Sequence, residues 1–413
     1  MTVLQLGEAA RAAKMGIALL GSDQKNLLLL TIADLLVENT DRILQANSID
    51  LANAKDNNIG DVMSDRLRLN EERIQNMADA MRKMTTLDDP VGIVEGGSTR
   101  PNGLKIIHKR VPIGVVAIIY ESRPNVTVDA ACLCLKSGNA VILRGGREAI
   151  NSNIALVDVI KQGLKMHNLS EDTVGIVEDT SHESARELME LTGYIDLLIP
   201  RGSQELINAT LNNAKVPVIE TGAGNCHIYV DEYANLEMAL SITENAKIQR
   251  PSVCNAVETL LVHRLVAEEF LPMLYDRIGK RVELRGDEEV VRIIPNALKA
   301  TEEDWYTEFN DYILAVHIVE DVNKAIEHIE KYGTHHSEAI ITENVRTADI
   351  FLSSIDSAAL YLNASTRFTD GEEFGLSAEI GISTSKLHAR GPMGLKALTT
   401  TKTIVLGDGQ IRG

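Results

Sequence analysis

The sequence predicts an α/β fold with two parallel-sheet domains and a small β element for oligomerisation. Apolar runs of strand length alternate with segments of helical periodicity from residue 104 to residue 362, which is typical of parallel sheets with helices on both faces. The alternation starts again after residue 225, so it describes two sheets. The 413 residues are also enough for about two or three domains.

Residues 1–90 are expected to be helical, because positions such as Leu28, Ile32 and Leu36 are apolar at helical spacing. Residues 91–103 are rich in glycine and contain a proline, so we expect a loop. The strands expected next are 104–111 (a basic, exposed ribbon), 114–120, 140–143, 173–177, 195–199 and 216–220. The helices expected between them are 127–136, 153–166, 182–191 and 204–212.

In the second half of the chain, strands are expected at 226–230, 257–262, 313–319, 338–341 and 358–362. Helices are expected at 232–250, 264–279, 321–331 and 344–353. The tail from residue 383 is rich in turns and ends in a short β-like segment over 403–406. We expect this tail and the ribbon over 104–111 to pair with another subunit.

The composition narrows the possible functions. The formal net charge of −18 argues against nucleic-acid binding, which needs clustered lysine and arginine. The N-terminus lacks the apolar core of a signal peptide, and no run approaches the ~20 apolar residues of a membrane span. We therefore expect a cytoplasmic protein with no membrane contact.

Four cysteines in a chain of this length do not form a disulfide scaffold. Cys132 and Cys134 form a pair, but no second pair lies at zinc spacing, so we expect helix packing and no metal site. Cys254 differs, because it lies just before the largely apolar run 257–262 and follows Arg250 by four residues. A thiol next to a cation is a candidate nucleophile; the alternative is a small buried hydrophobe.

Two short loops are candidates for binding an anionic ligand. Gly145-Gly146 follows the strand 140–143, where a ligand can approach the backbone closely, and the flanking Arg144 and Arg147 suit a phosphate. Gly202-Ser203 precedes the helix 204–212, whose free N–H groups could receive a phosphate. The alternatives are an ordinary turn and simple helix capping by Ser203.

Further polar clusters lie in expected loops. Glu220 ends an expected strand 34 residues before Cys254 and is a candidate base, although a lone glutamate is usually solvated. Ser365-Thr366-Arg367 suits carboxylate or phosphate recognition, with a surface salt bridge as the alternative.

Four longer segments occur in a recognisable order. They are Tyr120-Glu121-Ser122-Arg123-Pro124-Asn125, the stretch 319–340 with Tyr332-Gly333-Thr334-His335-His336-Ser337-Glu338, the stretch 363–371, and the stretch 378–392. Together they resemble the aldehyde dehydrogenase superfamily, most closely its acyl-phosphate-reducing branch, the gamma-glutamyl phosphate reductases. The resemblance covers nearly the whole chain.

The resemblance implies a role for each candidate residue. Cys254 falls on the catalytic thiol and Glu220 on the general base, and Asn125 is a candidate oxyanion donor. NADPH/NADP is the implied cofactor, bound by Arg144, Gly145, Gly146, Arg147, Gly202, Ser203 and Glu308. The implied substrate-binding residues are Arg250, Ser365, Thr366 and Arg367.

The resemblance also implies the domains and the reaction. Residues 1–225 would bind the cofactor, 226–356 would form the catalytic domain, and 357–413 would return to the cofactor domain and end in the oligomerisation tail. The implied reaction is NADPH-dependent reduction of L-glutamyl 5-phosphate to L-glutamate 5-semialdehyde and phosphate, in proline biosynthesis, through a Cys254 thioester. We expect a homo-oligomer, and a contact with glutamate 5-kinase is an open expectation. Two alternatives remain: an oxidative aldehyde dehydrogenase that hydrolyses its thioester, and a non-catalytic partner of the kinase.

Overall fold

The computed structural model describes residues 1–57, 61–376 and 378–412. The chain forms two compact units. The first comprises Met1–Glu220, Gly375–Gly381 and Met393–Gly413, and the second comprises Thr221–Phe374 and Ile382–Pro392. The domain limits at residues 225 and 356 that the sequence suggested stay a prediction. Among the described residues, no helix is long and apolar enough to cross a membrane.

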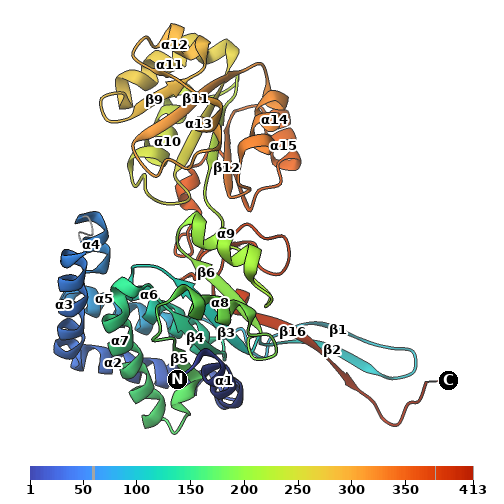
Figure 1. Ribbon diagram of the computed structural model, residues 1–413. Helices are drawn as coiled ribbons and strands as arrows, with labels where there is room; N and C mark the ends of the chain where they lie inside the picture. The colour runs from blue at the N-terminus through green and yellow to red at the C-terminus, as the bar shows by residue number, and fades with distance from the viewer. Residues whose placement is uncertain (58–60, 377, 413) are drawn as a thin grey trace. The chain divides into compact units, whose positions relative to one another are not determined.

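A four-stranded parallel sheet forms the centre of the first unit, in the order β5-β4-β3-β6 (Figure 1). These strands are β3 (Val115–Tyr120), β4 (Ala140–Arg144), β5 (Val174–Ile176) and β6 (Leu197–Arg201). Every residue of β3 is buried, which explains why the strand reads as one apolar run.

Helices cover both faces of this sheet. Val115 and Ala117 belong to a cluster with residues of α1 (Val3–Ala18) and α8 (His182–Glu190). Tyr120 points to the opposite face, because side chains alternate along a strand, and its hydroxyl lies 2.6 Å from Thr127 Oγ1 in α6. The remaining helices of the unit are α2 (Ser22–Glu38), α3 (Thr40–Asp56), α4 (Asp61–Leu67), α5 (Glu71–Met84), α6 (Pro124–Lys136), α7 (Ile150–Met166) and α9 (Gln204–Asn213).

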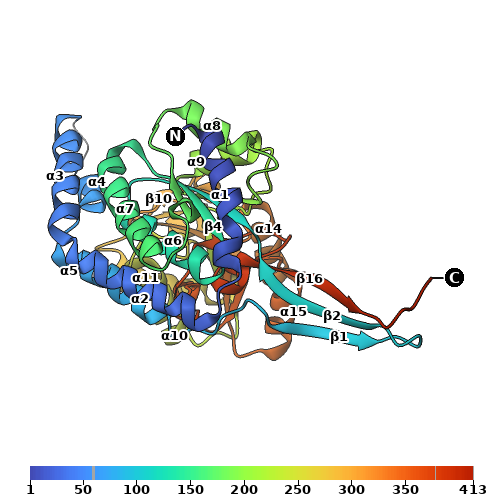
Figure 2. The same ribbon diagram turned by 90° about the horizontal axis from the view of Figure 1, so that it is seen from below.

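A three-stranded antiparallel ribbon projects from the first unit (Figure 2). It consists of β1 (Val94–Thr99), β2 (Lys105–Pro112) and β16 (Thr399–Leu406), with β2 in the middle. The strand expected over 104–111 is thus present. The loop expected over 91–103 was wrong in part, because pairing with β2 makes a strand of the glycine-rich Val94–Thr99 segment.

The expectation of a strand over 216–220 was also wrong, because this segment forms only an isolated bridge. Pro217 has no N–H to donate, and only Val218 forms an isolated bridge, with Leu198 of β6.

The second unit contains a seven-stranded parallel sheet, in the order β10-β9-β11-β8-β7-β12-β13. The strands are β7 (Cys226–Val230), β8 (Val257–His263), β9 (Glu283–Gly286), β10 (Leu298–Lys299), β11 (Ile313–Val319), β12 (Ser337–Ile341) and β13 (Ala359–Leu362). The helices are α10 (Leu236–Ile248), α11 (Arg264–Ile278), α12 (Glu288–Ile293), α13 (Glu302–Tyr306), α14 (Val322–Tyr332) and α15 (Val345–Ser354). A short pair, β14 (Ile382–Ser383) and β15 (Gly391–Pro392), completes the unit.

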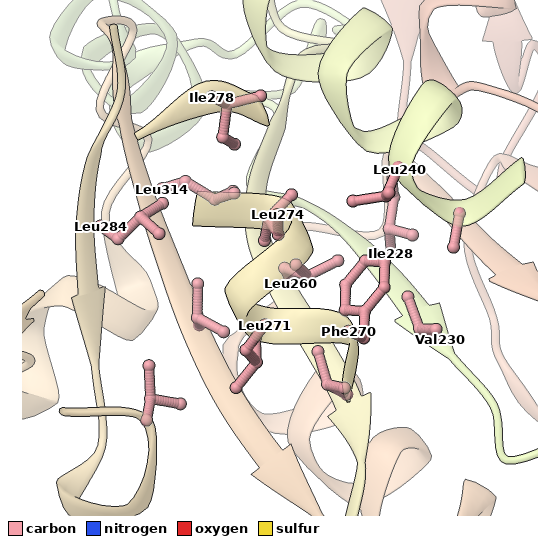
Figure 3. Packing of buried hydrophobic residues seen from close by; sticks show 14 of the residues in the cluster. Ile228, Val230, Leu240, Leu260, Phe270, Leu271, Leu274, Ile278, Leu284 and Leu314 are labelled. Atoms are coloured by element: carbon pink, nitrogen blue, oxygen red, sulfur yellow. The ribbon is translucent and has the colours of Figure 1, made fainter. Parts of the chain in front are cut away.

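The two faces of this sheet pack against different helices. Phe270 and Leu274 of α11 lie in one cluster with Leu260 of β8 (Figure 3). Tyr229 of β7 points to the other face, where its ring stacks on Phe351 of α15. Each fully buried side chain of this size contributes about 1.5–3 kcal/mol, so the sheet is a rigid support for the loops at its edges.

Candidate active site

Cys254 lies at the amino-terminal end of the strands of the second sheet, in a turn between α10 and β8. Helix α10 ends at Ile248, before the expected end at residue 250, because Pro251 cannot continue a helix. Arg250 and Cys254 therefore do not share a helical face, which corrects the geometry expected from their spacing. Cys254 is half-buried, whereas Asn255 is buried, so the thiol stands where the chain enters the core.

The segment before β7 packs directly against the main chain of Cys254. A Cβ on Gly224 would lie 1.4 Å from the Cys254 carbonyl oxygen, so only glycine fits at this position. The Gly224 N–H donates to Glu308 Oε1 at 2.9 Å. The buried Cys226 thiol donates to the Cys254 carbonyl oxygen at 3.1 Å. Burial raises the pKa of Cys226, so this thiol stays protonated and acts as a donor.

Asn255 joins the turn that contains Cys254 to the segment that carries Arg367. Its side-chain amide donates to the carbonyl oxygens of Thr369, at 2.9 Å, and Arg367, at 3.3 Å. Its side-chain oxygen accepts from the Arg367 guanidinium, which also donates from Nε to Gln249 Oε1 at 3.0 Å. Arg367 is therefore held in one orientation from two sides.

The charge of Arg367 acts on the site. Burial and the neighbouring Arg250 hold the pKa of Arg367 below its usual value, while the charge of Asp370 and the nearby sulfur groups of Cys254 and Cys226 oppose this shift. Arg367 is half-buried, so water screens its field only in part. The site thus brings together a thiol and two guanidinium groups in a protein of negative net charge.

The two hydroxyl groups next to Arg367 bind the backbone. Thr366 Oγ1 donates to the Asn255 carbonyl oxygen at 2.7 Å, and Ser365 Oγ accepts from the Arg367 N–H at 3.3 Å. Both residues are buried. Their role in substrate binding stays a prediction.

A buried ion pair lies at the same edge of the sheet. Lys247 Nζ is 2.5 Å from Glu258 Oε2, and both side chains are fully buried. Glu258 Oε1 also accepts from the Asn310 N–H at 3.2 Å, which holds the segment that carries Glu308. Burial raises the pKa of Glu258 and lowers that of Lys247, and their mutual attraction opposes both shifts.

All the candidate cofactor residues except Glu308 lie in the first unit, at the carboxyl ends of β4 and β6. A Cβ on Gly145 would lie 2.2 Å from Asn153 Nδ2, so the backbone is closely packed from behind. Arg144 donates to the carbonyl oxygens of Thr180, at 2.8 Å, and Ser181, at 2.9 Å. Its buried Nε has no hydrogen-bond partner within the part of the chain that the structure describes. Such an unsatisfied donor suits an incoming acceptor such as a phosphate or ribose oxygen.

The second candidate cofactor loop, Gly202-Ser203, already holds a carboxylate. Glu121 accepts from the Ser203 N–H at 2.9 Å and from Ser203 Oγ at 2.8 Å. Ser203 also caps α9, as its alternative interpretation stated. The loop at Gly202-Ser203 can therefore hold an anionic oxygen, because Glu121 supplies one here.

Three more predicted residues belong to the first unit. Arg147 is exposed, and its side chain makes no hydrogen bond or ion pair with the described residues. Asn125 is exposed at the start of α6 and donates to Asp129 Oδ2 at 3.0 Å. Burial raises the pKa of Asp129 to about 6, against the Asn125 hydrogen bond and the charge of Arg201. Glu220 is half-buried at the end of the unit, and its role as a base stays a prediction.

The aldehyde dehydrogenase family model matches residues 2–293 of this chain. The fold and the thiol-bearing turn thus define a member of the aldehyde dehydrogenase family. Gamma-glutamyl phosphate reductase of Carboxydothermus hydrogenoformans is 57% identical over 412 residues, covering 100% of this chain and 99% of the relative. The enzyme of the same name from Ligilactobacillus salivarius is 55% identical, covering 99% and 98%.

A solved structure is similar over the same length. The crystal structure of gamma-glutamyl phosphate reductase from Thermotoga maritima has a TM-score of 0.98 and 48% identity, with 100% of both chains covered. The chain belongs to the gamma-glutamyl phosphate reductase family, whose members are oxidoreductases of proline biosynthesis. The fold class and the family suggested by the sequence motifs are thereby confirmed.

Sequence reasoning did not find several residues that shape the site: Glu121, Gly224, Cys226, Lys247, Asn255 and Glu258. The sequence did contain a signal for Asn255 and Gly224. Asn255 is an amide next to a candidate nucleophile, and Gly224 is a glycine after an expected strand, so both could have been examined as residues that shape the site. The Lys247–Glu258 pair carried none, since the two charges are 11 residues apart and read as solvated.

Proposed function

We propose that this protein catalyses the NADPH-dependent reduction of L-glutamyl 5-phosphate to L-glutamate 5-semialdehyde and phosphate, through a thioester on Cys254. The observation that carries the proposal is the half-buried thiol of Cys254, held in a fixed turn within the field of the oriented Arg367. A nearby cation favours the thiolate, which is the nucleophilic form.

The residues of the first unit fit a nicotinamide dinucleotide phosphate. Arg144 offers an unsatisfied buried N–H, the closely packed Gly145 leaves its backbone open to an approaching ligand, and Arg147 offers an exposed guanidinium for a 2′-phosphate. Gly202-Ser203 would receive a further anionic oxygen, with Glu121 moving aside. Glu308, in the second unit, would hold a ribose hydroxyl. When bound, the reduced cofactor supplies the hydride that reduces the acyl carbon.

Cys254 would attack the acyl carbon of the substrate as a thiolate. The carbon–sulfur bond forms, the carbon–oxygen bond to phosphate breaks, and phosphate leaves with the electron pair. Arg250 and Arg367 would hold the anionic groups of the substrate by charge-assisted hydrogen bonds. After the reduction the carbon–sulfur bond breaks again, which releases the aldehyde and restores the Cys254 thiolate.

The oxyanion that forms during both steps needs hydrogen-bond donors. The Cys254 N–H and the exposed side chain of Asn125 are the candidates we retain. Glu220 would have no water to activate in the reductive direction, so its role is a separate question. The homo-oligomer, the contact with glutamate 5-kinase and the cytoplasmic setting remain parts of this proposal.

Substitution of the nucleophile tests the proposal. Cys254→Ala is expected to abolish phosphate-dependent reduction of NADP by the semialdehyde while NADPH binding persists. A matched control, Cys134→Ala, removes a buried thiol of α6 and should keep the activity. Turnover in Cys254→Ala would overturn the covalent route. Wild-type activity that needs no phosphate would instead identify an oxidative, hydrolysing enzyme.

A further inference from the structure

The side chain of Asn255 occupies an unusual position for a residue next to a nucleophile. It is buried, and all its polar groups, together with its own carbonyl oxygen, bind one short segment, Thr366–Thr369. This segment contains Arg367. The turn of Cys254 and the guanidinium are therefore linked through a single carboxamide, although they lie more than 100 residues apart in the sequence.

We propose that Asn255 is a positioning residue that holds the Arg367 guanidinium beside Cys254, where it stabilises the thiolate and receives an anionic group of the substrate. A carboxamide suits this task because it donates to the carbonyl oxygens of the segment and accepts from its guanidinium at the same time. An aspartate has the same size but only accepts, and its negative charge would offset that of Arg367.

The substrate half of this inference rests on the proposed function, whereas the thiolate half does not. The rate at which iodoacetamide alkylates Cys254 reports the thiolate fraction without substrate or cofactor. Its pH dependence, followed by mass spectrometry of the peptide that contains residue 254, gives the midpoint of thiol ionisation.

Asn255→Asp is expected to raise this midpoint. The alkylation rate at pH 7 should then fall about tenfold for each pH unit by which the midpoint rises. Asn255→Ala adds no charge and should raise it less. Arg367→Gln should raise it as well, and the double variant Asn255→Ala/Arg367→Gln should add little to Arg367→Gln alone, because the two residues act through one guanidinium. A merely structural role of Asn255 would give additive losses of stability with an unchanged midpoint.

Asn363→Asp is the matched control. Asn363 also bridges two backbone groups with its carboxamide, the N–H and the carbonyl oxygen of Thr342, which follows the carboxyl end of β12. Its substitution should lower stability without moving the midpoint.

An unchanged midpoint in Asn255→Ala and Arg367→Gln would overturn the inference even if the enzyme reduces its substrate by the thioester route. Full reactivity of Cys254 with the expected shifts, but no phosphate-dependent turnover in the wild type, would support the thiolate half and reject the proposed function. If Asn255→Asp does not fold, Asn255→Ala alone decides between these outcomes.

Discussion

The Cα atom of Gly224 lies so close to Cys254 that a methyl group on it would sit 1.4 Å from the carbonyl oxygen of the cysteine. The segment just before β7 and the turn before β8 therefore touch through their main chains. Cys254 is positioned by backbone packing as well as by side chains.

Gly224→Ala is expected to displace the turn of Cys254 and lower kcat by about 10²-fold, since a shift of about 1 Å at a reacting group can cost that much. Steady-state kinetics of phosphate-dependent NADP reduction would measure the loss. Gly16→Ala is the control, because a Cβ there makes only an ordinary contact with Leu169, 3.8 Å away. It should keep kcat and add about 0.5–1 kcal/mol of stability. A normal kcat in Gly224→Ala would show that the turn can relax without consequence.

Arg147→Glu is expected to weaken NADPH binding by roughly 10–100-fold, because a hydrogen bond to a charged group contributes about 1.5–3 kcal/mol. NADH lacks the 2′-phosphate and should be affected much less. Fluorescence titration with both nucleotides would give the two dissociation constants. Arg42→Glu, which changes an exposed arginine of α3, should alter neither. Equal losses of affinity for NADPH and NADH would show that Arg147 does not bind the 2′-phosphate.

Asp129 should make the stability of the protein depend on pH. Its pKa rises from 3.8 to about 6 through burial, so the unfolded chain loses this proton at a lower pH than the folded chain does. The free energy of unfolding therefore falls as pH rises from about 4 to about 7, by at most about 3 kcal/mol from this group. Urea unfolding should show this fall in the wild type and a smaller one in Asp129→Asn. Asp158→Asn, at an exposed carboxylate, should behave like the wild type; an identical pH dependence in Asp129→Asn would contradict the assignment.

Lys247→Met should lower the free energy of unfolding by about 3–5 kcal/mol, because it leaves the Glu258 carboxyl buried without its cation. The double variant Lys247→Met/Glu258→Leu should recover most of this loss. Lys331→Met removes an exposed ion pair with Glu302 and should leave the free energy of unfolding nearly unchanged, because water screens this pair. Urea unfolding of the three variants measures all these values. Equal losses of unfolding free energy in Lys247→Met and Lys331→Met would show that the buried ion pair contributes no more to stability than the exposed one.

The parts of the fold that could be predicted from the sequence are those in which one local pattern decides the structure. Strands β3, β7, β8 and β12 are buried on both faces, so β3 is a continuous apolar run and the other three are mainly apolar, with a few buried polar residues such as Glu258 and Glu338. β1 could not be predicted in this way, because Val94–Thr99 is exposed throughout and becomes a strand only by pairing with β2. The short strands β10, β14 and β15 depend on their partners in the same way.

The candidate site followed the same rule. Cys254 and the glycine loops could be found because each is a local motif. The link between Asn255 and Arg367 could not, since it joins residues 112 positions apart and exists only once both segments reach the amino edge of the sheet. The end of α10 was predictable in principle from Pro251, which the spacing argument for Arg250 overlooked.

The strands of the second sheet all run away from Cys254, because the sheet is parallel and the thiol precedes β8. The loops at the opposite ends of the strands can therefore carry a reporter without disturbing Cys254. Val345 begins α15, just after the carboxyl end of β12, and its side chain is 82% exposed. A cysteine introduced by Val345→Cys could be labelled with a fluorophore after selective protection of Cys254. The fluorophore would report ligand binding without changing the surroundings of the Cys254 thiol.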